Sequence, residues 1–272
     1  GFGGGNGINT SWMAGLNAAA DLFDNKMNVG GNYVYNQSKR DILSRSIETD
    51  RSFQNGDYMI TRNGVDTPGV NSTTSYGHRF GMRLDHKFSE NTSILFQPQI
   101  NFGTGNYLQT SDFSTERFNN QNTLTNSSNG FSNNSGNNNN WQTNGFLLFR
   151  QRLGMPGRTL SFMGNYSFSH NQMDGFTQSL TNSWNTREGE GQDIVNQRTE
   201  QLSNSSSLSG RLVYTEPLGN GFYASANYSY AWSKNTSTKD AYDSGSNVIG
   251  DKSFIYDPRG ESRNETYSSN IL

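Results

Sequence analysis

The feature that most constrains this chain is a repeated pair of stretches in which apolar and polar residues alternate across a short turn. The four turns centre near Asn25, Glu90, Pro156 and Leu218, at nearly even intervals along the sequence. A fixed period of this kind indicates one supersecondary unit used repeatedly. Each unit is predicted to be a β-hairpin with a tight turn at one end and a very long connection at the other.

The alternation assigns each side chain to one of two faces. In the first hairpin Trp12, Leu16 and Leu22 share one face, and Asn17 and Asp21 share the other. A period of two puts one face of a strand in an apolar medium and the other in a polar one. The expected apolar rows of the other hairpins are Phe80, Met82, Leu84, Phe96 and Ile100; Leu147, Phe149, Phe162 and Phe168; and Leu208, Leu212, Tyr214, Tyr228, Tyr230 and Trp232. Within the second hairpin, Pro98 is expected to weaken its strand because proline donates no ladder hydrogen bond.

Composition argues against a conventional soluble core. Hydrophobic residues make up 31% of the 272 residues, whereas a globular domain carries about 45–50%. The net charge of −2 removes the case for a nucleic-acid partner, which needs a basic face. The chain has no cysteine, so disulfides, zinc–thiolate sites and cysteine nucleophiles are excluded. The remaining histidines and carboxylates form no catalytic constellation, and the sequence predicts neither an enzyme nor a cofactor or metal site.

A membrane offers the apolar medium that the alternating rows require. The longest fully apolar run, Phe146–Phe149, is far shorter than the roughly 18 residues of a membrane helix. A barrel strand needs only about 9–11 residues with one apolar face. Aromatic residues gather where such strands would leave the lipid, with Phe23, Phe88 and Phe222 beside the tight turns and Tyr33, Tyr35, Tyr230 and Trp232 toward the long connections.

The predicted fold is therefore all-β: an antiparallel, up-and-down transmembrane β-barrel segment of about eight strands in four hairpins, spanning residues 1–272 as one domain in the cell outer membrane. A soluble sandwich also alternates, but its inner faces must fill a packed core. Ala14, Ala18 and Ala224 are small for that role. An eight-stranded barrel complete in itself is a further alternative, although residues 270–272 read as an unfinished strand and favour an internal segment of a larger protein.

The connections opposite the tight turns are expected to be long exposed loops. They run over residues 37–75, 103–140, 171–200 and 235–265, and strands are expected to continue above the bilayer at 42–53 and 58–70. Residues 119–144 are rich in Asn, Ser and Gly and predict a solvated, poorly ordered loop tip. A sugar-binding loop is the alternative, since Asn and Trp141 suit hydroxyl groups and pyranose faces.

Charged residues on the polar face are the candidate site. These lumen-lining candidates are Arg79, Arg83, Asp85, Arg150, Arg152 and Arg211. A charged side chain facing lipid costs roughly 2–4 kcal/mol at mid-bilayer, so these groups are expected to face a lumen. They could line a solute path, hold a plug domain by salt bridges, or satisfy one another across neighbouring strands.

Parts of the sequence resemble a known family. The run Trp12–Asn17 followed by Gly30–Tyr33 is similar to early barrel strands of TonB-dependent receptors, especially the large outer-membrane β-barrel proteins of Bacteroidetes. Asp85–Phe88 and Asn227–Tyr230 resemble the repeating strand-end pattern of that family. The resemblance is one of composition along most of the chain and rests on no discrete motif.

What the resemblance implies is a barrel of about 22 strands, closed by an N-terminal plug that this sequence lacks. It also implies TonB-dependent uptake of a bulky nutrient such as a glycan, peptide or metal chelate. The expected partners are outer-membrane lipid, the plug and the TonB system of the parent protein, with a surface lipoprotein as a further candidate. The rival hypothesis is a secreted or surface β-rich adhesin, in which the faces of Trp12, Phe162 and Tyr228 would pack against protein.

Overall fold

The computed structural model describes residues 7–54, 57–64, 68–244, 248 and 253–271. All the regular secondary structure in this part of the chain is β-strand. The strands are β1 (Gly7–Leu22), β2 (Met27–Ser44), β3 (Ile47–Gln54), β4 (Asp57–Gly64), β5 (Gly69–Ser89), β6 (Thr92–Phe118), β7 (Leu124–Arg152), β8 (Thr159–Asn185), β9 (Gly189–Gly219), β10 (Phe222–Asp243) and β11 (Ile255–Ile271).

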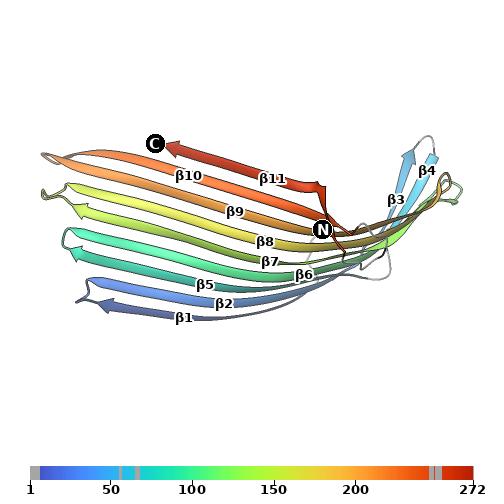
Figure 1. The fold of residues 1–272 in the computed structure, drawn as a ribbon, viewed down its shortest axis with the longest axis horizontal. Coiled ribbons are helices and arrows are strands. Elements are labelled where there is room, and N and C mark those ends of the chain that lie inside the picture. The colour runs from blue at the N-terminus through green and yellow to red at the C-terminus, as the bar shows by residue number, and fades with distance from the viewer. Residues whose placement is uncertain (1–6, 55–56, 65–67, 245–247, 249–252, 272) are drawn as a thin grey trace.

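The strands form one antiparallel, up-and-down sheet in the order β1-β2-β5-β6-β7-β8-β9-β10-β11 (Figure 1). The short hairpin β3–β4 lies off this path, and β4 pairs with the far end of β6. Sequential strands are therefore spatial neighbours, as the hairpin pattern predicts. The expected all-β antiparallel fold is confirmed, but the described residues form eleven strands rather than about eight.

The four predicted tight turns all lie at one end of the sheet. They connect β1 to β2, β5 to β6, β7 to β8 and β9 to β10, and Figure 1 shows them together on the left. Left-handed backbone closes three of them: Asn25 has φ 64°, Gly157 has φ 92°, and Asn220 has φ 52°. Asn and Gly tolerate this region better than other residues. The first turn also places Phe23 (φ 54°) and Asp24 (φ 55°) there, and its sequence does not explain the conformation of Phe23.

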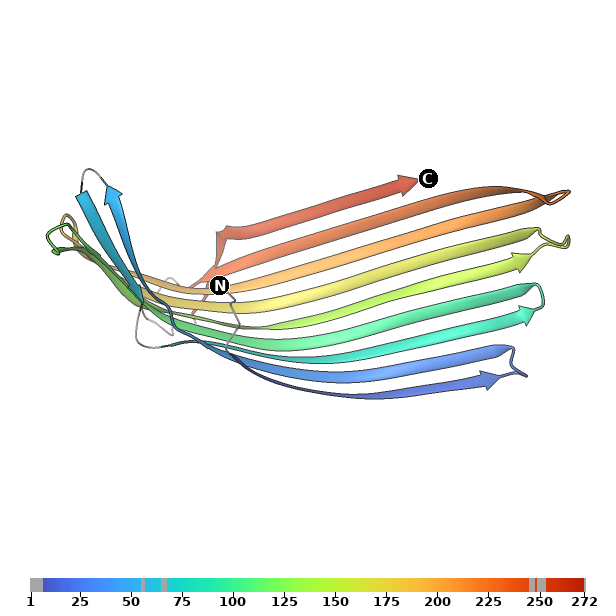
Figure 2. The same ribbon diagram turned by 180° about the vertical axis from the view of Figure 1, so that it is seen from behind.

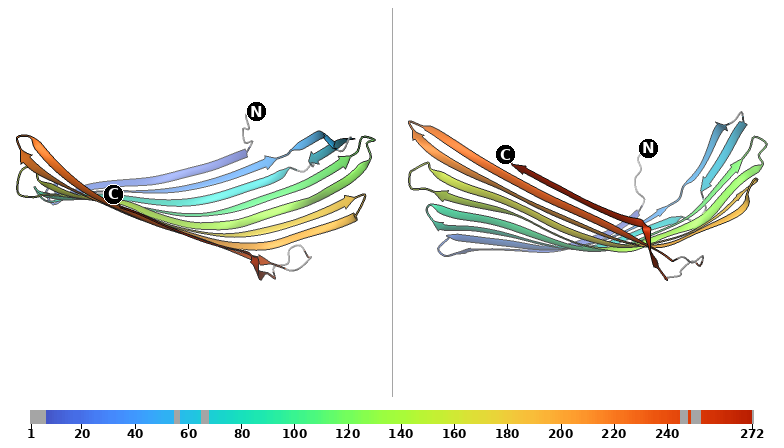
Figure 3. Two further views of the ribbon diagram at one scale, coloured as in Figure 1. Left: turned by 90° about the horizontal axis from the view of Figure 1, so that it is seen from above. Right: turned by 45° about the horizontal axis from the view of Figure 1, so that its top comes forward.

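The sheet is a single curved layer. Figure 2 shows the strands running side by side from behind, and Figure 3 shows the sheet bent into a trough. Among the described residues the only buried hydrophobic side chain is Ala241, at 2% exposure. The structure thus differs from a sandwich, whose two sheets would enclose a packed core.

The predicted long loops are wrong over most of their length. Strands continue through residues that lack alternation, so that β6 and β7 pair from Thr92–Gln151 up to Phe118–Leu124. The supposed loop tip at 119–144 is mostly β7, and the connection is only residues 119–123. Main-chain ladder hydrogen bonds hold these strands together, and such bonds do not require the side chains to alternate in polarity.

Pro98 is accommodated inside the sheet. Its strand, β6, pairs on one side with β7 through Pro98 itself, which lies opposite Gly145. On the β5 side the ladder runs from the pair Gly81–Gln99 directly to the pair Leu84–Phe96. The missing donor of proline therefore leaves a gap in one ladder, without ending the strand.

The two outer strands of the sheet are β1 and β11. Each has one neighbour, and because every neighbouring pair is antiparallel, β1 and β11 run in the same direction. The alternative of an eight-stranded barrel closed on itself is wrong for the described chain, since the sheet is open between these two strands. Direct pairing of β1 with β11 would be parallel, unlike every other pair in the sheet.

Candidate functional site: the two faces of the sheet

The register aligns like side chains in continuous rows across the sheet. On one face Phe96 of β6 lies opposite both Leu84 of β5 and Leu147 of β7. On the other face Asn144 of β7 lies between Gln99 and Ser167. We call these the apolar face and the polar face. Strand pairing therefore joins the alternating residues of each strand into two continuous surfaces, one apolar and one polar.

Large side chains of the apolar face are exposed. Leu16 is 74% exposed, Trp12 53%, Tyr228 53% and Phe162 38%. No described residue forms a second layer over them. An exposed apolar patch of this extent marks a surface that contacts another protein or a membrane.

Aromatic rings form a row across the apolar face where the alternation ends. Tyr35 contacts both Trp12 and His78, with ring centroids 4.8 and 4.9 Å apart. Further along the row Trp141 stacks on His170 at 6.1 Å. Aromatic rings with polar atoms favour the level at which hydrocarbon meets water. The predicted girdle toward the long connections thus includes Trp12 and two histidines beside the tyrosines.

The apolar face also carries a hollow floored by glycine. Gly164 and Gly210 lie opposite each other on β8 and β9. The Phe162 ring packs against both glycines, and Leu212 and Tyr230 also line the hollow. The hollow measures about 520 Å³. Its lining is almost wholly hydrocarbon and aromatic, so its occupant must be apolar.

All six charged candidates lie on the polar face. The guanidinium of Arg79 donates to Gln99 Oε1 at 3.0 Å, and that of Arg83 pairs with Asp85 at 3.3 Å. Arg150 and Arg152 of β7 and Arg211 of β9 are exposed on the same face. Among the described residues, none of their guanidinium groups has an ion pair or hydrogen bond. The predicted mutual satisfaction across strands therefore does not hold for these three arginines.

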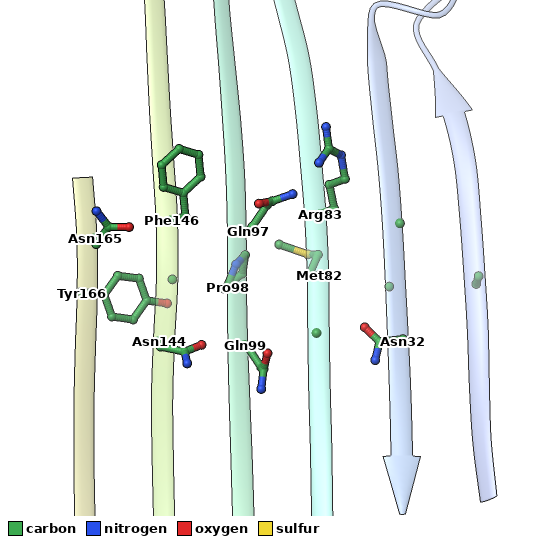
Figure 4. Close-up of a pocket in the computed structure, with 15 residues that line it drawn as sticks. Asn32, Met82, Arg83, Gln97, Pro98, Gln99, Asn144, Phe146, Asn165 and Tyr166 are labelled. Atoms are coloured by element: carbon green, nitrogen blue, oxygen red, sulfur yellow. The ribbon is translucent and has the colours of Figure 1, made fainter. Parts of the chain in front are cut away.

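A hollow of about 720 Å³ opens on the polar face between β2 and β8. Gly30 leaves space at its floor, whereas the Asn32 side chain already covers Gly81. Amides and one guanidinium surround the hollow. Figure 4 shows these groups, which include Asn32, Arg83, Gln97, Gln99, Asn144 and Asn165, with Phe146 at one end. Amides offer both donors and acceptors, so the hollow can bind water or an uncharged polar solute.

Sequence reasoning missed an ionic cluster at the far end of the sheet, away from the tight turns. Arg198 pairs with Asp174 at 3.4 Å and with Glu200, and its guanidinium lies 5.9 Å from the ring centroid of Phe176 and 5.7 Å from that of Tyr242. The cluster joins β8, β9 and β10. Arg198 and Glu200 are neighbours on β9, but Asp174, Phe176 and Tyr242 come from the adjacent strands. Only the register brings these strands together, so no local motif could have revealed the cluster.

Acid is expected to loosen the extension of β2 and β5 beyond the aromatic row. There the Ser72 hydroxyl donates to Asp41 at 2.5 Å, and Lys39 lies 3.2 Å from the same carboxylate. The hydroxyl, and then the ammonium group, hold the pKa of Asp41 below its ordinary value. A lowered folded-state pKa adds stability above the unfolded value of about 3.9, and this stability is lost as pH falls through the folded value.

Hydrogen exchange of the β2–β5 extension, corrected for intrinsic rates, measures this loss between about pH 5 and about pH 2. Protection is expected to fall with pH in the wild type. The variant Asp41→Asn should lose that component of the pH dependence, and Ser72→Ala should shift it toward higher pH. Equal pH dependence in wild type and Asp41→Asn would show that this carboxylate has no part in it.

Other kinds of site are not found in the described residues. They contain no helix long and apolar enough to cross a membrane. The same residues hold no group of three or more His, Cys, Asp or Glu side chains arranged to bind a metal ion.

Comparison with known proteins gives only distant likenesses. No family model and no curated protein matches the chain. Among solved structures, the crystal structure of Acinetobacter baumannii OccAB4 aligns over 96% of this chain and 91% of its own, with 8% identity and a TM-score of 0.12. Pseudomonas aeruginosa OccK9 (OpdG) aligns over 98% and 97%, with 7% identity and a TM-score of 0.11. TM-scores of this size do not establish a shared fold.

Proposed function

We propose that this sheet is part of the wall of an outer-membrane β-barrel, with its apolar face toward lipid and its polar face toward the lumen. By the family resemblance, the parent protein is a TonB-dependent receptor that imports a bulky nutrient such as a glycan, peptide or metal chelate. This sheet contributes wall and outer extensions, and its residues perform no covalent chemistry.

The observation that carries the proposal is a one-layered sheet with one apolar and one polar face. In lipid every backbone group must find a partner within the protein, and paired strands provide that. The apolar rows of β5 extend from His78 to Phe88, which matches the roughly 9–11 residues that a tilted barrel strand needs. The glycine-floored hollow beside Phe162 offers space for acyl chains.

Single cysteines on adjacent residues test which face touches lipid. The chain has no cysteine of its own, so each variant carries one reporter. Leu16→Cys, Phe96→Cys and Ala226→Cys are expected to react with a lipid-soluble thiol probe in outer membranes. The matched neighbours Asn17→Cys, Gln97→Cys and Asn227→Cys should react instead with a water-soluble probe. Water-soluble labelling of all six positions would refute the membrane wall.

The energised-uptake part of the proposal needs its own experiment. Cells carrying the parent protein are incubated with a labelled oligosaccharide, a labelled peptide or a ferric chelate, with and without an uncoupler of the proton gradient. Accumulation of one class that stops on uncoupling, or on loss of TonB, is the expected result. Accumulation that continues unchanged in both conditions would point to passive diffusion through the barrel.

The adhesin hypothesis predicts a different environment for the apolar face. It needs protein against Trp12, Phe162 and Tyr228, which in the described chain are 53%, 38% and 53% exposed. Exposed apolar side chains suit lipid or a protein partner alike. The cysteine experiment also separates the two hypotheses, since an adhesin would show no labelling by a lipid-soluble probe.

A further inference from the structure

An ion pair lies on the apolar face at the tight-turn end of the sheet. Arg158 closes the turn between β7 and β8, and Glu216 shares its face of β9 with Tyr214 and Leu212. The Arg158 guanidinium donates from Nε and Nη2 to the two carboxylate oxygens of Glu216, at 2.7 and 2.5 Å. The Tyr214 hydroxyl donates to the same carboxylate. Charged groups on a face that meets lipid belong at the level of the head groups, where their polar ends stay out of hydrocarbon.

The ion pair leaves hydrogen-bonding capacity unused on both of its partners. A guanidinium has five N–H donors, and Glu216 takes two of those on Arg158. Among the described residues the other three have no partner. A carboxylate offers about four lone-pair sites, of which Arg158 and Tyr214 together fill three. A ligand that suits the pair therefore brings acceptor oxygens to Arg158 and an N–H donor to Glu216.

An apolar path leads from the ion pair to the glycine-floored hollow. Leu160 lies opposite Tyr214, and the next pair on this face, Phe162 with Leu212, lines the hollow. The glycine floor lies roughly 20 Å along β9 from Glu216, at about 3.3 Å per residue. With a strand tilt of about 45°, this is a depth of roughly 14 Å, close to half of a hydrocarbon core about 30 Å thick. An acyl chain whose head group lies at the ion pair therefore ends in the hollow.

We propose that the ion pair and the hollow form one binding site for a glycerophospholipid with a primary amine in its head group, taken from the leaflet at the tight turns. The lipid phosphate accepts from the free N–H groups of Arg158, its ammonium group donates to Glu216, and one acyl chain passes Leu160 into the hollow. The inference rests on the proposed function in placing the apolar face against lipid. It adds one lipid held at a fixed place on the wall.

The two charges decide among the head groups of phospholipids. Arg158 and Glu216 sum to zero, so a head group that is itself neutral overall leaves no charge unpaired. A head group with a negative charge alone would lie against the Glu216 carboxylate, which repels it. A trimethylated amine has no N–H to donate and would leave the free carboxylate site unfilled. The primary amine is therefore the best match.

Lipid retention by the full parent protein tests the head group. The protein is reconstituted in nanodiscs that hold phosphatidylethanolamine, phosphatidylglycerol and phosphatidylcholine in equal amounts and with the same acyl chains. Native mass spectrometry then identifies the lipids that stay bound after the disc is removed. We expect one phosphatidylethanolamine to be retained about tenfold more than either of the others, a factor equivalent to about 1.4 kcal/mol. Equal retention of the three lipids by the unmodified protein would overturn the inference.

Two variants test the two ends of the site separately. Glu216→Gln removes the negative charge and is expected to make phosphatidylglycerol the preferred lipid, because the Arg158 guanidinium is then unneutralised. Leu208→Trp fills part of the hollow and should lower retention of phosphatidylethanolamine about fourfold for each methylene group that it excludes. The matched control Leu16→Trp lies on the apolar face of β1, outside the hollow, and should retain the lipid as the wild type does.

Heat-modifiable migration on gels verifies the assembly of each variant before its lipids are measured. A head-group preference that Glu216→Gln leaves unchanged, or a retention that Leu208→Trp lowers no more than Leu16→Trp does, would contradict the lipid site. The proposed function would survive each of these results if Phe96→Cys still labels from lipid.

Discussion

Arginine in place of Phe96 is expected to destabilise the folded sheet in a bilayer by roughly 2–4 kcal/mol, while arginine in place of the adjacent Gln97 should change stability little. Phe96 lies in the middle of the apolar rows, opposite Leu84 and Leu147. A guanidinium there would be held in hydrocarbon. At residue 97 the side chain enters the polar face, where Arg83 is already accommodated.

The two variants differ by one position in the chain and carry the same new side chain, so each is the control of the other. Equilibrium unfolding by urea of the parent protein in lipid vesicles gives both free energies, and the heat-modifiable fraction in outer membranes gives assembly. Equal losses at residues 96 and 97 would mean that both faces meet the same medium. That outcome would contradict the membrane wall directly.

The sequence predicted the part of the fold whose two faces differ in polarity. From Trp12 to Leu22, and from Phe222 to Trp232, one face is apolar and the other polar, and this leaves a period of two. In the proposed membrane wall, both faces beyond the aromatic row meet water. Residues such as Asn133, Asn137 and Asn138 then carry no periodicity, although β7 pairs through all of them. These strands are held by main-chain hydrogen bonds to their neighbours, and the pattern of side chains in the sequence does not reveal such bonds.

The sequence predicted which face of the sheet carries the candidate site residues, but not which groups they contact. Alternation placed Arg79, Arg150 and Arg211 on one face, and the register confirms that placement. Whether an arginine meets a carboxylate depends on which strands are adjacent and how they are aligned. Phe146 and Leu148 are apolar residues on the polar face of β7. That Leu148 lies opposite both Leu95 and Met163 follows only from the register of three strands.

A single serine inserted between Phe80 and Gly81 is expected to prevent assembly of the barrel. Because side chains alternate with a period of exactly two residues, one extra residue exchanges the faces of everything on one side of it. If the segment before the insertion shifts, Arg79 turns toward lipid. If the segment after it shifts, Arg83 and Asp85 do so. Either choice costs roughly 2–4 kcal/mol for each arginine near mid-bilayer, apart from the hydrogen bonds lost with β2 and β6.

Two further insertions isolate the cause of that loss. Two serines at the same place restore the faces while shifting the register, and should leave a weakened but assembled barrel. One serine between Glu90 and Asn91 lies in a tight turn and should be tolerated. Heat-modifiable migration in outer membranes measures all three. A β-bulge that absorbs the single serine would keep both faces intact and let the protein assemble. That result would mean that a local bend of the strand costs less free energy than placing a guanidinium in lipid. The proposal that the alternation reflects lipid on one face and water on the other would then lose its strongest energetic support.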